Sequence, residues 1–148
     1  MARVDYYTIV SEIGQILNAD TTLSGVQVTV EDSAPLDSGP WIAIYLESRT
    51  PSSGQSISAG TRTRYNLRIS VWCWQFSLES TARAAQLRDD LVGLVEIALM
   101  KKRTLNDKVG SIYLEGGELM SEQIKSDEMS GFVAGGEIII IADVVAIT

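Results

Sequence analysis

The sequence contains no histidine, and this absence removes the side chain that most often serves as a general base near neutral pH. It also excludes Ser-His and Cys-His catalytic pairs and the imidazole ligands of zinc sites. The single cysteine, Cys73, cannot form a disulfide within the chain, and its place in an apolar row predicts a buried thiol. We therefore expect no catalytic residues, no cofactor and no metal site.

Phosphate-binding motifs are also missing. The Gly116-Gly117 and Gly135-Gly136 pairs do not open a helix and are not followed by the Lys-Ser/Thr pair of a P-loop. Such glycines are typical of turns and bulges. Acidic pairs such as Asp89-Asp90 are adjacent in sequence, and adjacent side chains diverge on a helix or strand. We interpret these carboxylates as solvated surface rather than as a joint site.

Basic residues are in the minority, with 12 lysines and arginines against 19 aspartates and glutamates and a net charge of −7. This balance argues against electrostatic capture of nucleic acid by the whole domain. No apolar run is long enough to span a bilayer, and the N-terminus does not resemble a secretory signal, so we expect a soluble protein. Some arginines could form a local basic patch, or could be solvated strand ends and loop anchors: Arg49, Arg62, Arg64, Arg68 and Arg83.

The centre of the sequence predicts a strand from Arg62 to Gln75 that leads directly into a helix from Leu78 to Lys102. Alternate residues from Tyr65 to Cys73 are apolar, which is typical of a strand with one buried face. The other face begins with arginines and ends with Trp72 and Trp74. We interpret the two tryptophans as core residues, with stacking on bases or sugars as the alternative.

The predicted helix has a hydroxyl for its start, from Ser77 or Ser80, and three cations for its end, from Lys101 to Arg103. Its apolar residues share one broad arc, which predicts packing on a sheet: Ala84, Leu87, Leu91, Leu94, Val95, Ala98 and Leu99. Ile97 and Met100 fall outside this arc, on the otherwise polar side. Either a partner covers them there, or they are scattered apolar residues of the kind that is common on protein surfaces.

Upstream, the pattern predicts a first helix from Tyr6 to Leu17, capped by Asp5, and then a short strand with alternating valines. The next strand, from Trp41 to Ser48, is mostly apolar on both parities, as expected for a strand covered on two sides. The run from Arg49 to Thr63 is small and polar. We expect a long loop there, which either orders on a partner or is a flexible hairpin.

Downstream, the segment from Val109 to Ile124 predicts two strands hinged at its glycine pair. The final strand, from Glu137 to Ile147, is apolar on both faces, so we expect it inside the sheet or paired with a neighbouring chain. With 148 residues, 45% of them hydrophobic, the chain is expected to form one domain. The fold class is α+β: a mainly antiparallel sheet with the N-terminal helix and the long helix on one face, and a long loop between two central strands.

The order and proportions of these elements resemble the tail terminator, or tail-completion, family of tailed bacteriophages. The similarity covers nearly all 148 residues and lies in element order, size and loop placement. The matching features are the N-terminal helix (Tyr6 to Leu17), the strand pair joined by a long polar loop (Trp41 to Ser48 and Arg64 to Gln75), the long helix (Leu78 to Lys102) and the apolar final strand (Glu137 to Ile147).

This resemblance implies a hexameric ring that caps the tail tube, stops its elongation and joins the tail to the head-tail connector. The implied partners are further copies of the chain, the tail tube protein and a neck protein, with no membrane, in a virion assembled in the host cytoplasm. DNA would pass through the ring without specific binding. The candidate interface loop comprises Arg49, Ser52, Gly54, Ile57, Arg62 and Arg64, and the candidate subunit contacts are Ile97, Met100, Ile139 and Ile141.

Two other classes stay open. The first is another head-tail connector or tail structural protein of similar proportions. The second is a small cytoplasmic module whose long loop closes on a ligand. A ligand site needs convergent polar groups around an apolar pocket, and none can be assembled from the sequence.

Overall fold

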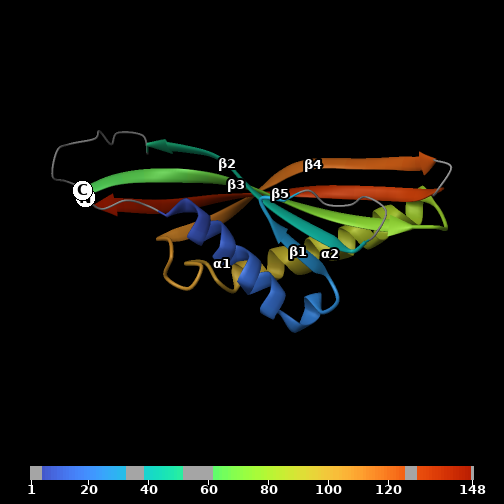
Figure 1. The fold of residues 1–148 in the computed structure, drawn as a ribbon, viewed down its shortest axis with the longest axis horizontal. Helices are drawn as coiled ribbons and strands as arrows, with labels where there is room; N and C mark the ends of the chain where they lie inside the picture. Colours follow the sequence, from blue (N-terminus) through green and yellow to red (C-terminus); the bar gives the residue numbers. More distant parts are fainter. Residues whose placement is uncertain (1–4, 33–38, 52–61, 126–129, 148) are drawn as a thin grey trace.

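The computed structural model describes residues 5–32, 39–51, 62–125 and 130–147, with the backbone alone at residues 62–63, 125 and 145–147. These residues form one five-stranded sheet, in the order β1-β2-β3-β5-β4, and two long helices (Figure 1). The predicted α+β class is confirmed. The elements are α1 (Tyr6–Ala19), a short 3-10 helix η1 (Thr21–Leu23), β1 (Gln27–Val30), β2 (Trp41–Pro51), β3 (Arg62–Ser77), α2 (Thr81–Met100), β4 (Ser111–Lys125) and β5 (Ser130–Ile147).

The sheet is mainly antiparallel, as predicted. Among the described strands, only β1 and β2 pair in parallel, and the other three pairings are antiparallel. The last strand, β5, lies between β3 and β4, so both of its edges are paired. The expectation that this apolar strand lies inside the sheet is therefore confirmed.

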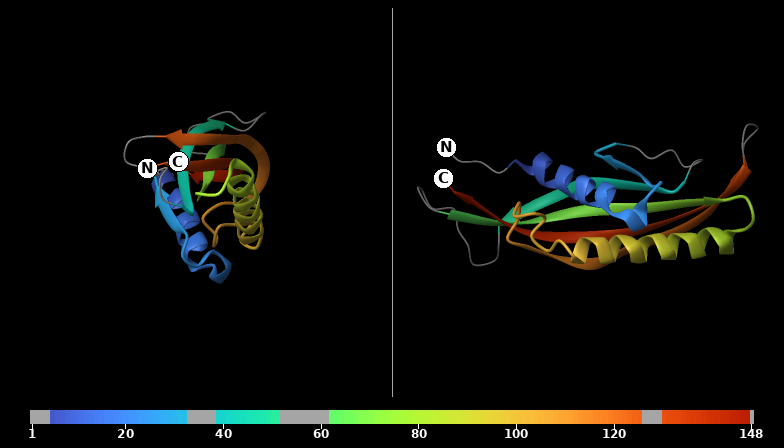
Figure 2. Two further views of the ribbon diagram at one scale, coloured as in Figure 1. Left: turned by 90° about the vertical axis from the view of Figure 1, so that its right-hand side faces the viewer. Right: turned by 90° about the horizontal axis from the view of Figure 1, so that it is seen from below.

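Both helices pack on the same face of the sheet (Figure 2, left). α1 covers β1 and β2, whereas α2 covers β3 and β5. Asp5 caps α1 as predicted, accepting a hydrogen bond from Thr8 N at 3.1 Å. Ser80, one of the two predicted caps, accepts a hydrogen bond from Arg83 N at 3.0 Å, so α2 begins at Thr81 rather than at Leu78. The core between helices and sheet contains apolar side chains from both layers, among them Val10, Ile13, Leu17, Ile42, Ile44, Leu67, Ile69, Leu99 and Ile140.

The strands are longer than the sequence pattern predicted. β2 continues through a bulge between Leu46 and Ser48 and pairs with β3 as far as Pro51, so Arg49 lies in a strand rather than in a loop, whereas Arg64 lies in β3 within the predicted strand. The connection between β2 and β3, residues 52–61, lies outside the described residues. Backbone pairing extended these strands into polar sequence, where alternation of apolar residues gives no signal.

The segment expected to form two hinged strands is the single strand β4. A register shift between Gly116 and Leu119 accommodates the glycine pair, and pairing with β5 continues on both sides of it. β5 correspondingly begins at Ser130 rather than at Glu137. The glycines therefore form a bulge within a ladder instead of a hinge between two strands.

Trp72 and Trp74 lie on the face of the sheet opposite the helices. A Cβ on Gly136 would meet Val92 of α2, whereas a Cβ on Gly135 would meet the ring of Trp74. Because neighbouring strand residues point to opposite faces, Trp74 lies on the face away from α2, together with Trp72. Both are half-buried, so the prediction that they are core residues is wrong. Their position follows the parity of the strand: they continue the polar row that begins with the arginines.

Both edges of the sheet are partly capped by the chain's own groups. At the β2 edge, the Glu31 carboxylate accepts a hydrogen bond from Leu46 N at 2.6 Å, just beyond the end of β1. At the β4 edge, Arg88 Nη1 donates to the Met120 carbonyl at 3.4 Å, and Ile112 N donates to the Arg103 carbonyl at 2.8 Å. Capped edges of this kind reduce uncontrolled strand pairing between molecules.

Candidate functional site

Arg49 lies at the base of the β2–β3 hairpin, on the side of α1. Its Nη1 donates a hydrogen bond to the Tyr6 hydroxyl at 2.9 Å, and its guanidinium carbon lies 5.2 Å from the centroid of the Tyr6 ring and 5.9 Å from that of Tyr65. These distances are typical of cation–π contacts. Arg49 therefore connects the first turn of α1 to the base of the hairpin.

The other arginines of the hairpin base lie on the opposite face and contact carboxylates. Arg64 Nε is 3.2 Å from Asp143, and Arg68 bridges Glu47 at 2.9 Å and Glu115 at 3.6 Å. These side chains are about half exposed, so each pair contributes little to stability. The arginines whose side chains the structure describes thus form separate contacts instead of one basic patch. The alternative interpretation, solvated strand ends and anchors, describes them better.

Most of the candidate interface loop cannot be placed. Ser52, Gly54 and Ile57 lie outside the described residues, and of Arg62 only the backbone is described, at the start of β3. The structure does describe the base of the hairpin, where Arg49 and Arg64 lie in paired strands.

Two of the candidate subunit contacts form an exposed apolar patch on α2. Ile97 is 57% exposed and Met100 is 40% exposed, on the side of the helix opposite its buried residues. Gly93 lies one turn before Ile97, and a Cβ placed there would meet nothing within 4 Å. We call Gly93, Ile97 and Met100 the α2 patch. Large apolar side chains this exposed favour a role in association.

The other two candidate subunit contacts, Ile139 and Ile141, lie in β5, which is paired on both sides. Ile139 is only 1% exposed, and Ile141 is half-buried opposite Arg68. Burial within the chain's own sheet leaves Ile139 almost no surface for another subunit. Burial inside the sheet explains why Ile139 is apolar. A position inside the sheet was the first of the two expectations for this strand.

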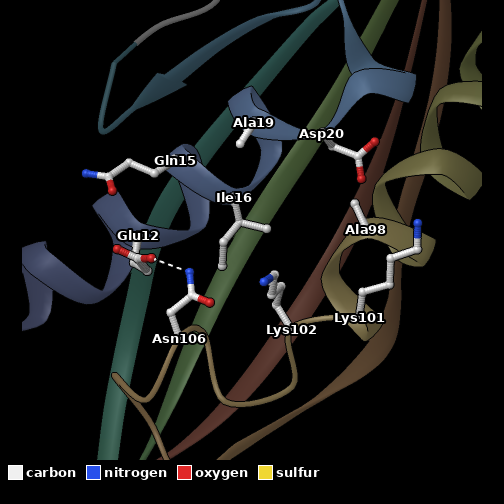
Figure 3. Close-up of a pocket in the computed structure, with 9 residues that line it drawn as sticks. All are labelled: Glu12, Gln15, Ile16, Ala19, Asp20, Ala98, Lys101, Lys102 and Asn106. Atoms are coloured by element: carbon white, nitrogen blue, oxygen red, sulfur yellow. Dashed lines mark hydrogen bonds between the residues drawn. The ribbon is translucent and has the colours of Figure 1, made fainter.

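A cleft of about 460 Å³ lies between α1 and the C-terminal end of α2 (Figure 3). One wall carries Glu12 and Asp20, from α1 and its C-terminal cap, and the opposite wall carries Lys101 and Lys102. The floor is apolar and includes Ile16 and Ala98. Sequence analysis missed this cleft because its lining comes from three separate segments. The two lysines had been interpreted only as the end of a helix.

The rim of the cleft is completed by a turn with unusual backbone geometry. Leu105, Asn106 and Asp107 have φ angles of 49°, 56° and 68°, all in the left-handed region. The buried Leu105 side chain anchors this turn in the core. Asn106 then points at α1 and donates from Nδ2 to the Glu12 carboxylate at 2.7 Å (Figure 3). Three successive non-glycine residues in this region are uncommon and carry conformational strain.

Asp20 is held in a fixed position at the upper end of the cleft. One of its carboxylate oxygens accepts hydrogen bonds from the Thr22 hydroxyl at 2.6 Å and from Thr22 N at 2.9 Å. These bonds lower the pKa of Asp20, the hydroxyl more than the backbone group, and Lys101 adds a smaller effect. The carboxylate therefore remains charged at neutral pH.

The described residues contain neither an accessible thiol nor a metal site. Burial raises the pKa of the Cys73 thiol to about 12, so this side chain is not an accessible nucleophile. In this part of the chain, no three acidic or cysteine side chains gather as a metal site would require. Within the described ranges, no helix combines the length and the apolar content needed to cross a membrane. No protein-family model matches the chain, and no curated protein matches it.

Proposed function

We propose that this protein is a structural subunit of a bacteriophage tail. In this proposal it forms a ring, a hexamer as in the tail terminator family that the sequence resembles, which caps the tail tube and joins it to the head-tail connector. Its partners are then further copies of itself, the tail tube protein and a neck protein. Its location is the virion, after assembly in the host cytoplasm.

The observation that carries this proposal is the α2 patch. Ile97 and Met100 lie outside the core that the same helix builds with the sheet, and they expose large apolar surfaces. A ring made of identical subunits joins one surface of each subunit to a different surface of the next. Exposed apolar residues on a long, well-packed helix suit one side of such a contact, because the helix holds them in fixed positions.

The hairpin formed by β2 and β3 supports a contact outside the ring. Figure 1 shows the ends of β2, β3 and β5 extending past α2 and beyond the first turn of α1. β3 and β5 are paired along the whole of this extension, and Arg62 and Ile147 form the outermost pair. A paired extension of this kind can reach a tube or a neighbouring subunit without unfolding the domain.

The charge of the chain suits a DNA conduit. The net charge of −7 repels phosphate groups rather than holding them, and the described arginines at the hairpin base are already paired with acids or aromatic rings. DNA would then pass through the ring without specific binding.

The mass of the purified protein in solution tests the proposal, followed by negative-stain imaging of the same sample mixed with isolated tail tubes. Rings, or a monomer that becomes a cap on tube ends, are the expected results. A monomer that leaves tube ends bare would contradict the tail-cap proposal. In that case the same sample should be tested against isolated connectors, because another neck component is the competing class.

A further inference from the structure

The two walls of the α1–α2 cleft carry opposite charges that no direct ion pair joins among the described residues. None of the ion pairs among the described residues joins Glu12 or Asp20 to Lys101 or Lys102. Each carboxylate is instead held by its own neutral partner, Glu12 by Asn106 and Asp20 by Thr22. The acidic wall is therefore fixed in place, and the cleft stays open between the walls.

The end of α1 strengthens the negative side of the cleft. α1 ends at the acidic wall with Asp20 as its C-terminal cap, and a helix C-terminus carries partial negative charge from its last carbonyl groups. The two lysine side chains supply the positive side and can move, because they are exposed and long. A rigid acidic wall thus faces an adaptable basic wall.

The space between the walls has the size and floor of a small binding site. Its volume of about 460 Å³ lies within the range of roughly 300–1,000 Å³ that is typical of ligand pockets. Ile16 and Ala98 give the floor an apolar surface. This arrangement is the set of convergent polar groups around an apolar centre that a ligand site requires.

We propose that the cleft binds a zwitterionic ligand about the size of a dipeptide, with its ammonium group at the Glu12 end of the acidic wall and its carboxylate against Lys102. A ligand with a single charge gains attraction from one wall and meets repulsion at the other. A ligand with both charges, separated by a short apolar segment, gains from both walls and from the floor. The site therefore favours ligands that carry both charges. It disfavours ligands with a single charge, because one wall repels them.

This proposal does not depend on ring formation, and a matched set of small probes tests it. The probes are the dipeptide Ala-Ala, its N-acetylated form, its C-terminal amide and the form with both blocks, each titrated calorimetrically into the full-length protein at low ionic strength. The free dipeptide is expected to bind at least about tenfold more tightly than either singly charged form, because each block removes one charge-assisted contact. Equal binding of all four forms, or no binding of the free dipeptide up to about 10 mM, would overturn the proposal.

Two variants locate the charges. Lys102→Met should weaken binding of free Ala-Ala by roughly tenfold but should not weaken binding of the amide, which lacks a carboxylate and is repelled by the lysine. Glu12→Gln keeps an acceptor for Asn106 and should have the converse selectivity, weakening free Ala-Ala but not the N-acetylated form. Lys108→Met and Glu118→Gln are matched controls, since these exposed residues do not line the cleft. Controls that weaken binding as much as the cleft variants would assign the effect to net charge and overturn the site.

The source of the zwitterionic group is decided by one further probe, the blocked peptide acetyl-Lys-Ala-Glu-amide. It carries both charges on side chains, as an internal segment of a protein does, and has no charged termini. If it binds as tightly as free Ala-Ala, the site accepts a segment of another protein. If only the free dipeptide binds, the ligand is a small molecule.

Discussion

The indole ring of Trp74 lies against the backbone of Gly135 on the neighbouring strand. A Cβ at Gly135 would lie far inside van der Waals contact with Trp74 Cζ3. The ring cannot move aside freely, because Trp72 stacks on it with a centroid distance of 5.2 Å and an interplanar angle of 14°. This contact makes glycine necessary in the middle of an internal strand, where it is otherwise unfavourable.

Gly135→Ala should therefore destabilise the fold by about 1–3 kcal/mol, through overpacking against the stacked tryptophans. Gly116→Ala is the matched control, because a Cβ on this β4 glycine would meet nothing within 4 Å. Its unfolding free energy should be unchanged or raised by up to about 1 kcal/mol, since alanine restricts the unfolded chain. Urea denaturation of both variants measures the difference, and equal effects would show that Trp74 does not restrict the site.

The sequence predicted local features well and three-dimensional ones less well. The cap at Asp5 was predicted correctly, and Ser80 was one of two predicted caps for α2, because capping depends on residues within one turn. The tryptophans of β3 were placed in the wrong layer, because period-2 alternation separates two faces without saying which face a helix covers. The packing of Trp74 on Gly135 of β5 depends on a register that the sequence pattern does not reveal.

The α1–α2 cleft was beyond sequence analysis for a different reason. Its acidic residues, its lysines and Asn106 are brought together only when the two helices pack side by side on the sheet. The turn that orients Asn106 has three left-handed residues and no glycine, so it lacks the usual sequence signal for positive φ. Tertiary packing, through the buried Leu105, imposes this geometry.

Glu31 should protect the β2 edge, because its carboxylate accepts the hydrogen bond of Leu46 N. β1 ends before it could pair with this donor. Glu31→Ala exposes this donor, and we expect a loss of roughly 0.5–1 kcal/mol in the free energy of unfolding and faster aggregation. Glu31→Gln keeps an acceptor in the same place and should behave like the wild type. Urea denaturation and light scattering check both variants, and an alanine variant that matches the glutamine variant would remove this role.

Cys73 should make stability fall in alkaline solution. Its pKa is raised to about 12 in the folded protein, chiefly by burial and to a smaller extent by the charge of Glu96, whereas a free thiol has a pKa of about 8.5. Between these values the unfolded state binds fewer protons than the folded state, so the unfolding free energy decreases as pH rises. The stabilising effect of the neutral thiol is complete below pH about 8.5 and is lost as pH rises towards about 12.

The measurement is the difference between wild type and Cys73→Ala in urea denaturation at several pH values. Other titrating groups affect both proteins alike. Above pH about 9, the wild type should lose up to about 1.4 kcal/mol more per pH unit than the variant. Parallel pH profiles would show that the thiol is accessible or ionises normally in the folded state.

Ile97 and Ile139 should separate assembly from folding. Ile97→Ser removes an exposed apolar side chain, so the unfolding free energy should change by less than about 0.5 kcal/mol while self-association weakens by at least roughly tenfold. Gln86→Ser, on the same exposed side of α2, is the matched control and should leave both unchanged. Ile139→Lys places a charge at a position that is 1% exposed, so it should cost several kcal/mol and prevent folding itself. Sedimentation and urea denaturation of the three variants distinguish these outcomes, and an Ile97→Ser protein that associates like the wild type would exclude the α2 patch as a subunit contact.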